Sequence, residues 1–220
     1  MRPPKSQSHL VRPGRIDHLV YACSDLQKGI ERISTLLGVV PVMGGHHPNW
    51  GTHNALVGLG SDCYLEVIAP VQRTASDDVR TPDVFAGSDT GRLTTWAAGV
   101  NNLEGSADSL LGLDPPLGSL IRGSRRQANG QMLSWVLTDP STSILEGTVP
   151  FLIDWGDSDH PAGSLDSPCS LLSLQLAHPR LDAVESYLSA LGLLDLVELQ
   201  QAEQPTLSAI VETPQGRVGI

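Results

Sequence analysis

One strand-turn-helix pattern occurs three times along this chain of 220 residues. The copies begin with DHLVYACSDL, TTWAAGVNNL and LSLQLAHPRL, which share this layout and a weak local similarity. A helix-ending LLG, LLG or ALG follows each of them at a similar distance. A small unit of this kind cannot cover its own sheet and must pack against its neighbours. The repeat therefore constrains the fold more strongly than the composition does.

The first copy, residues 15–70, predicts a strand, a helix and then three further strands. RIDHLVYA at 15–22 is rich in the branched and aromatic residues typical of strands. Ser24 or Asp25 can cap the helix that follows, whose apolar residues recur at helical spacing. Gly38 supplies a left-handed helix end. The later strands, two of them joined by the hairpin turn Gly-Ser-Asp, are expected at 39–43, 52–59 and 63–69.

The other copies, 92–155 and 170–220, repeat this order and indicate an α+β fold of βαβββ modules. The second copy predicts a helix at 103–111, with strands at 93–99, 131–138 and 149–155. The third predicts a helix at 181–191, with strands at 171–177, 197–201, 207–212 and 217–220. We expect residues 15–220 to form one domain, with polar linkers at 71–91 and 156–168. Residues 1–14 are expected to be a flexible tail.

Composition excludes several classes of partner. The formal net charge is −10, and nucleic acids and anionic membranes both require a basic face. No apolar run approaches the ~20 residues that span a bilayer, and the basic N-terminus has no apolar segment after it. The three cysteines, Cys23, Cys63 and Cys169, lack the spacing of a metal site. Reduced thiols in the cytoplasm are the simplest interpretation.

His18 and Glu66 are polar residues in the middle of apolar strands. By alternation His18 opposes Asp17, whereas Glu66 shares a face with Tyr64 and Ile68. A buried carboxylate costs free energy unless it is paired or binds a metal. A neutral imidazole and a carboxylate on neighbouring strands form half of a site for a divalent cation. The alternatives are a hydrogen-bonded core histidine and a solvent-facing glutamate.

The glycine-rich stretch at 44–54 gathers polar and aromatic side chains in a predicted loop that leads into a strand. They are His46, His47, Trp50, His53 and Asn54. The histidines either line a pocket as donors and general bases or are loop residues that titrate near neutral pH. His53 is favoured as a base because it enters a strand and is therefore better fixed. Trp50, in the rigid segment PNWG, is expected to form a ring wall.

A second unusual run is VPFLIDWGDSDHP at 149–161. Asp154 lies beside Trp155 at the end of a strand, in the position that Glu66 has in the first copy. It is either a third metal ligand or a cap of the following turn, which Asp and Gly favour. Arg125 and Arg126 either clamp a substrate carboxylate or phosphate or form a solvated charge pair. The chain has no glycine-rich phosphate loop, nucleophile elbow or cysteine zinc pair.

Four segments, IDHLVYACSDL, HPNWGTHNAL, YLEVIAP and PFLIDWGDSDHP, resemble the glyoxalase-like domain proteins of the vicinal oxygen chelate superfamily. The resemblance covers roughly residues 15–220. It implies paired βαβββ modules that form a cupped mixed sheet around a divalent metal ion (Zn, Ni, Mn or Fe). It also implies ligands on the first and last strands of each module, here His18, Glu66 and Asp154. The side chains then expected to bind substrate are His46, His47, Trp50, His53, Asn54, Arg125, Arg126 and Trp155.

The expected function is a metal-dependent lyase or isomerase that acts on a small molecule with vicinal oxygens. Glu66 or His53 would move the proton. The chain departs from the family pattern, because Thr95 and Ser173 stand where the first copy has His18. One alternative is a non-catalytic protein that sequesters a small molecule, and another is a protein whose site has decayed. An extradiol-type dioxygenase is disfavoured because no second strand histidine is visible.

Because this superfamily pairs its modules, the third copy has no partner in the chain. It either pairs across a homodimer or covers a sheet edge. A monomeric mass by light scattering would contradict the homodimer.

Overall fold

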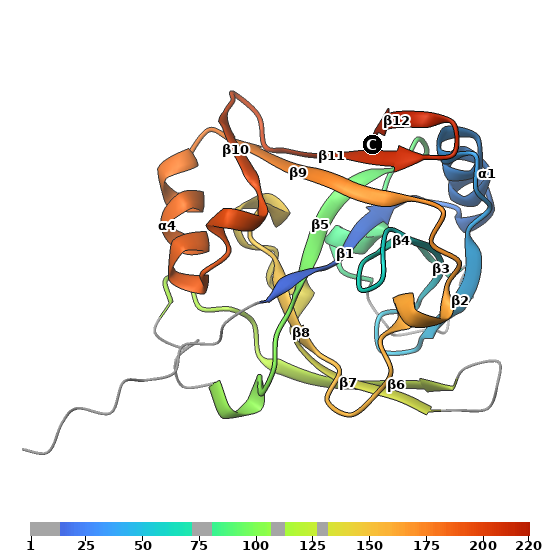
Figure 1. Cartoon of the computed structure of the whole chain (residues 1–220). Helices are drawn as coiled ribbons and strands as arrows, with labels where there is room; N and C mark the ends of the chain where they lie inside the picture. The colour runs from blue at the N-terminus through green and yellow to red at the C-terminus, as the bar shows by residue number, and fades with distance from the viewer. Residues whose placement is uncertain (1–13, 72–80, 107–112, 127–131) are drawn as a thin grey trace, which may run out of the picture.

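The computed structural model describes residues 14–71, 81–106, 113–126 and 132–220, which form an eight-stranded and a four-stranded sheet (Figure 1). The strand order in the larger sheet is β2-β3-β4-β1-β5-β8-β7-β6. Its strands are β1 (Arg15–Ala22), β2 (Val42–His47), β3 (Thr52–Gly58), β4 (Tyr64–Pro70), β5 (Arg92–Gly99), β6 (Leu120–Arg126), β7 (Met132–Thr138) and β8 (Phe151–Asp154). The expected curved, mixed sheet is confirmed.

The larger sheet consists of two halves with the same strand pairing. In each half the first strand lies parallel to the last, β1 beside β4 and β5 beside β8. The halves meet where β1 pairs antiparallel to β5. Where the sequence predicts a helix at 103–111, the described part is a 3₁₀ turn, Glu104–Ser106, and residues 107–112 lie outside the described residues.

The helix of the first half, α1 (Leu26–Leu37), begins and ends as predicted. The Asp25 side chain accepts a hydrogen bond from Lys28 N at 2.9 Å. Gly38 ends the helix with φ at 69°, a left-handed conformation that glycine adopts without a Cβ penalty. Its apolar stripe, with Ile33 and Leu37 fully buried, packs on one face of the sheet, which we call the outer face.

The opposite, inner face forms a cup. Alternation along β1 sends Leu19 and Tyr21 to the outer core and Val20 and Ala22 to the inner one. The edge strands β2 and β6 approach each other, and Arg125 Nη1 donates to the Gly44 carbonyl at 3.3 Å. The sheet is therefore nearly closed.

The third copy has the predicted order of elements but a different strand pairing. They are β9 (Ser170–His178), α4 (Leu181–Leu191), β10 (Glu198–Gln201), β11 (Thr206–Thr213) and β12 (Gly216–Gly219). The order in this sheet is β10-β9-β11-β12, so the first strand lies between the second and third instead of beside the last. The strand, helix and three strands expected at 170–220 are thus present, but they do not pair as the two halves of the larger sheet do. The sheet instead covers the outer face, over β1 and β5 (Figure 1).

Leu174→Ala is expected to destabilise the chain by about 2–5 kcal/mol, because it would leave a cavity under the smaller sheet. Leu174 is fully buried in the same core as Leu19 and Ile33. Leu172, in the same strand, is 46 % exposed, so Leu172→Ala should change the free energy of unfolding by less than about 0.5 kcal/mol. Urea denaturation checks both. Equal effects would contradict the packing of this sheet on the outer face.

Several shorter elements differ from expectation. Strand β2 includes the histidines that were expected in a loop, because they pair with β3 across a tight turn. The supposed surface linker at 71–91 contains a short helix, α2 (Asp83–Ala86), with Val84 and Phe85 buried. The other 3₁₀ turns are Pro140–Thr142, Ile144–Gly147, Pro161–Ser164 and Leu194–Leu196.

All three cysteines are buried free thiols. Among the described residues, no helix is long and apolar enough to cross a membrane.

Candidate functional site

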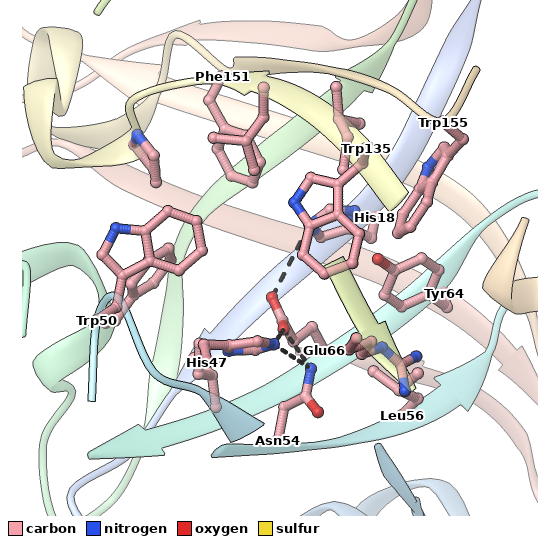
Figure 2. Close-up of a pocket in the computed structure, with 16 residues that line it drawn as sticks. His18, His47, Trp50, Asn54, Leu56, Tyr64, Glu66, Trp135, Phe151 and Trp155 are labelled. Atoms are coloured by element: carbon pink, nitrogen blue, oxygen red, sulfur yellow. Dashed lines mark hydrogen bonds and ion pairs between the residues drawn. The ribbon is translucent and has the colours of Figure 1, made fainter. Parts of the chain in front are cut away.

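The inner face of the eight-stranded sheet lines a cavity of about 510 Å³, counted with its open mouth (Figure 2). Its polar side chains come from five strands and are His18, His47, Asn54, Glu66 and Arg125. Aromatic side chains form much of the remaining wall and are Trp50, Tyr64, Phe85, Trp135, Phe151 and Trp155. The cup therefore combines a polar patch with an aromatic wall.

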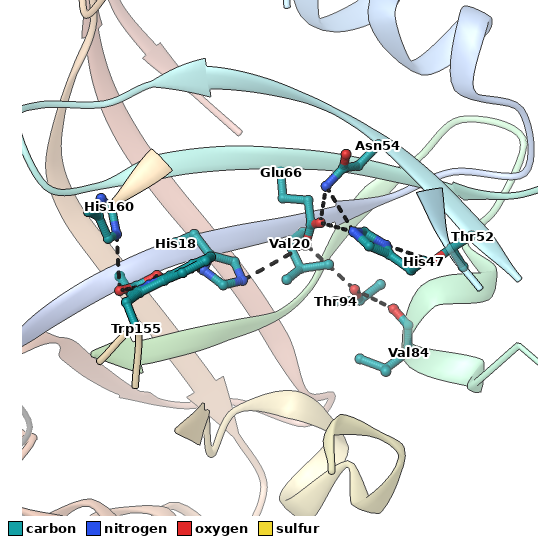
Figure 3. A network of polar contacts seen from close by, with 11 residues as sticks. His18, Val20, His47, Thr52, Asn54, Glu66, Val84, Thr94, Trp155 and His160 are labelled. Atoms are coloured by element: carbon teal, nitrogen blue, oxygen red, sulfur yellow. Dashed lines mark hydrogen bonds and ion pairs between the residues drawn. The ribbon is translucent and has the colours of Figure 1, made fainter. Parts of the chain in front are cut away.

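Asp17 anchors one side of the polar patch. An irregularity in the β1–β5 pairing between Ile16 and His18 interrupts the alternation. The Asp17 carboxylate can therefore meet the ring of its neighbour, with 2.9 Å between His18 Nδ1 and Asp17 Oδ1. Trp155 Nε1 donates to Asp17 Oδ2 at 3.1 Å, and His160 Nε2 lies 3.1 Å from the same oxygen (Figure 3). The expected separation of Asp17 from His18 is thus wrong.

The Asp17 carboxylate fixes the tautomer of His18. Burial acts to raise the pKa of Asp17, but hydrogen bonds from His160 and His18 outweigh it and bring the pKa well below its usual range. Because Asp17 is ionised, His18 Nδ1 carries a proton and donates it. The other nitrogen, Nε2, lies 3.8 Å from Glu66 Oε2. The His18 ring stacks on Tyr64 with 4.6 Å between centroids, which holds Nε2 in this direction.

Asn54 organises the other side of the patch. Gly45 N donates to Asn54 Oδ1 at 2.8 Å, so the amide nitrogen must face Glu66. That nitrogen donates to Glu66 Oε1 at 2.5 Å and lies 3.4 Å from His47 Nε2. His47 Nδ1 lies 3.0 Å from Thr52 Oγ1. Because the Asn54 nitrogen is a donor, His47 Nε2 is the acceptor of the two ring nitrogens and Nδ1 carries the proton.

His18 Nε2, His47 Nε2 and the Glu66 carboxylate thus face one another, and the Asn54 amide lies between Glu66 and His47. Burial is the main cause that lowers the pKa of His47, which keeps its imidazole neutral near pH 7. His47 Nε2 lies 4.0 Å from Glu66 Oε1, and both imidazole–carboxylate distances exceed those of hydrogen bonds. Within the described ranges no group of three or more His, Cys, Asp or Glu side chains has the spacing of a formed metal site. A cation between the two imidazoles and the carboxylate would bind to all three.

The comparison with known proteins agrees with this architecture. A family model described as a glyoxalase-like domain matches residues 16–192. The chain belongs to the glyoxalase-like domain family. This confirms the resemblance to the vicinal oxygen chelate superfamily. No curated protein matches the chain.

Solved structures include related folds at low sequence identity. A hypothetical protein from Staphylococcus aureus is 14 % identical, with a TM-score of 0.60 over 92 % of both chains, and this shows a shared fold. Methylmalonyl-CoA epimerase from Mycobacterium tuberculosis is 17 % identical, with a TM-score of 0.41 over 74 % of this chain and 97 % of that chain.

Most of the predicted site residues of this glyoxalase-like chain do come together in the cup. They are His18, His47, Trp50, Asn54, Glu66, Arg125 and Trp155. Figure 2 shows that Glu66, His47 and Asn54 lie side by side, with His18 behind them. The sequence predicted an imidazole and a carboxylate on neighbouring strands. His18 of β1 and Glu66 of β4 fit this prediction, because the two strands pair and Glu66 lies opposite Val20, two residues after His18.

Asp154 is not part of this cluster. Its carboxylate accepts hydrogen bonds from Leu103 N and Gly156 N, each at 2.9 Å. Its neighbours in sequence, Ile153 and Trp155, point into the cup instead. The position in β8 that matches Glu66 is therefore one residue away from Asp154. Of the two roles expected for Asp154, the structure has the second, a cap of the following turn.

His46 and His53 also lie away from the cup. They pair across β2 and β3, with ring centroids 5.8 Å apart, on the face opposite Asn54. The prediction of His53 as a general base is therefore wrong. His53 is fixed in β3 as expected, but its side chain lies on the face away from the cup. Arg126 ends β6, and its side chain lies outside the described residues.

Sequence reasoning missed two kinds of site residue. The first kind is the pair Asp17 and His160, in which Asp17 contacts His18 and His160 contacts Asp17. The segment DSDHP contains His160, but no role for this histidine was predicted from the sequence. Trp135 and Phe85 form walls from a strand and from a supposed linker. Aromatic residues are rare in this chain, and this rarity could have marked Trp135 and Phe85 as candidates for a site.

Proposed function

We infer that this chain is a metal-dependent enzyme of the isomerase or lyase type that acts on a small oxygenated molecule. The observation that carries the inference is the convergence of His18 Nε2, His47 Nε2 and the Glu66 carboxylate in the cup. Separations of 3.8 and 4.0 Å exceed the roughly 3.4 Å between ligands of one tetrahedral ion, so a bound ion would draw these side chains together. Two neutral imidazoles and a carboxylate are a common ligand set for catalytic divalent metals.

The residues present fit a three-ligand site in place of the four-ligand site that the family resemblance implied. His18 and Glu66 occupy the first and last strands of the first half. The corresponding strand of the second half, β8, directs Phe151 and Ile153 into the cup and supplies no ligand. His47, from β2, provides the third ligand. Three protein ligands leave open positions for substrate oxygens, as catalytic metal sites require.

The supporting network matches this role. The Asp17–His18 pair has the arrangement in which a carboxylate orients a metal-binding histidine. The bound ion would act as a Lewis acid that polarises a carbonyl or enolate oxygen. Glu66 has two oxygens, so one of them can take a proton from the substrate. Burial, the main cause, raises the pKa of Tyr64 well above its ordinary value, so its hydroxyl stays protonated and can donate to a substrate oxygen.

A second candidate is an extradiol-type dioxygenase. The sequence disfavoured it because a second strand histidine was not visible, but β2 provides His47 beside Glu66. Two histidines and one carboxylate are the ligand set of non-haem iron oxygenases. Tight iron(II) binding with oxygen consumption would favour this candidate over the isomerase or lyase.

The test is metal binding by protein made without a histidine tag and stripped with EDTA. We expect about one equivalent of Zn²⁺, Ni²⁺, Mn²⁺ or Fe²⁺ per chain by calorimetry and elemental analysis. His18→Ala should abolish this binding. His46→Ala is the matched control, since this histidine lies on the other face, and it should bind normally. Absence of binding for every ion would end the metal-enzyme proposal and leave a sequestering protein with an aromatic cup.

A further inference from the structure

We propose that the cup selects an aromatic carboxylate, a small molecule with a flat ring and an anionic group held by Arg125. This inference rests on the proposed function, because it takes His18, His47 and Glu66 as the reacting end of the cavity. It adds what the other walls recognise.

The distribution of aromatic residues carries the first part of the argument. The whole chain has only four tryptophans, three tyrosines and two phenylalanines. Both phenylalanines, three of the tryptophans and one tyrosine line this one cavity. The core on the outer face is built mainly from leucine, valine and alanine. A cup that needed only apolar filling could use the same residues, so the rings indicate a partner that benefits from ring contacts.

The rings form two walls with faces available to a guest. Trp50 and Phe85 contact each other edge to face, with centroids 5.7 Å apart, and Trp135 and Trp155 lie 5.4 Å apart. In Figure 2 Trp50 and Trp135 stand on two sides of the space that Glu66 faces. Both side chains are only partly buried, so they retain surface that a flat ring can cover. Aromatic pairs favour such stacked or edge contacts.

Arg125 provides the charge recognition. It lines the cavity from β6, and among the described residues its recorded hydrogen bond is the one at 3.3 Å from Nη1 to Gly44 O. A guanidinium has five donors in a planar fork, which matches a carboxylate in a bidentate manner. In a chain with a net charge of −10, a cation inside the cup favours an anionic guest over a neutral one. Arg122, in the same strand, is exposed and pairs with Glu104 instead.

The cavity size limits the guest. The empty space of about 510 Å³ includes the open mouth, so it is an upper bound on the volume of the guest. The three parts are then complementary, with the ring between the tryptophans, the carboxylate at Arg125 and an oxygenated position near Glu66.

The experiment is a ligand-observed ¹⁹F NMR titration of 4-fluorobenzoate into EDTA-stripped protein, with competition by benzoate, cyclohexanecarboxylate and benzyl alcohol. We expect benzoate to displace the probe. The saturated acid and the neutral alcohol should each compete at least about threefold more weakly. Arg125→Gln should weaken binding of the probe about 10- to 100-fold, since it removes charged hydrogen bonds. Trp135→Leu should weaken it about two- to tenfold.

Arg122→Gln is the matched control and should bind the probe like the wild type. Circular dichroism confirms that each variant is folded. Failure of the probe to bind, equal competition by the saturated acid or the alcohol, or unchanged affinity in Arg125→Gln would each overturn the inference. Metal binding is measured on the same stripped samples. If the protein binds the probe but no metal ion, the proposed reaction is contradicted and the inference about the aromatic carboxylate is not.

Discussion

Asp17→Asn is expected to destabilise the folded chain by about 3 kcal/mol at pH 7. The Asp17 side chain has no solvent-exposed surface and accepts hydrogen bonds from Trp155, His160 and His18. An amide in its place would direct an NH₂ group at donors that need an acceptor, or leave one of them unsatisfied. Thermal or urea unfolding measures the loss. Asp157→Asn, an exposed change, should have little effect.

The same variant should have a distinct pH profile. The folded-state pKa of Asp17 is lowered, whereas the unfolded chain has its ordinary value of 3.8. A lowered carboxyl pKa contributes stability that is present above about pH 4 and is lost as the pH falls through the folded-state pKa. The difference between wild type and Asp17→Asn should therefore be constant above about pH 5 and shrink below about pH 4. A difference that stays the same at low pH would contradict the ionised anchor.

The sequence predicted those parts of the fold in which local chemistry and burial agree. In β1 and α1, branched residues, a side-chain cap, helical spacing and a terminal glycine all favour the structure observed. His18 and Glu66 stood out because polar residues in apolar strands are costly without a partner. The period of two predicted which neighbours share a face with each of them along its own strand, and the pairing of β1 with β4 brings the two side chains together.

The parts that could not be predicted depend on pairing between distant segments. The bulge that turns Asp17 toward His18 arises from the contact of β1 with β5, not from the residues near Asp17. His47 lies beside Glu66 because β2 pairs with β3 in a register that the sequence does not specify. Asp154 shows the same limit, since a shift of one residue moves a side chain to the other face.

The third copy illustrates a different limit. Its order of strands and helix was predicted, but the order alone does not choose which strands pair. In the structure β10 lies parallel to β9 after the crossover through α4, and β11 takes the other edge of β9. The sheet then has one apolar face, with Leu174, Leu176 and Val211 buried against the outer face of the larger sheet. This copy therefore acts as a cover and contributes no wall to the cup.

Glu66→Gln is expected to lower metal affinity by at least about a hundredfold and to abolish turnover of the substrate. The amide keeps the shape of the side chain and can still accept the hydrogen bond from Asn54, so the structure of the cup should remain. The metal-free variant should be as stable as the metal-free wild type or more stable. The reason is that the change replaces a carboxylate at a buried position with a neutral amide that keeps the hydrogen bond from Asn54.

This combination separates a functional carboxylate from a structural one. A structural Glu66 would show a clear loss of stability without an effect on metal, whereas a ligand shows the reverse. Asp154→Asn is the matched control, because the family resemblance implied both carboxylates as metal ligands and only Glu66 lies in the cup. Its metal affinity should equal that of the wild type. Calorimetric metal titration and urea unfolding, both on stripped protein, measure the two quantities. Unchanged metal binding in Glu66→Gln would remove Glu66 from the ligand set.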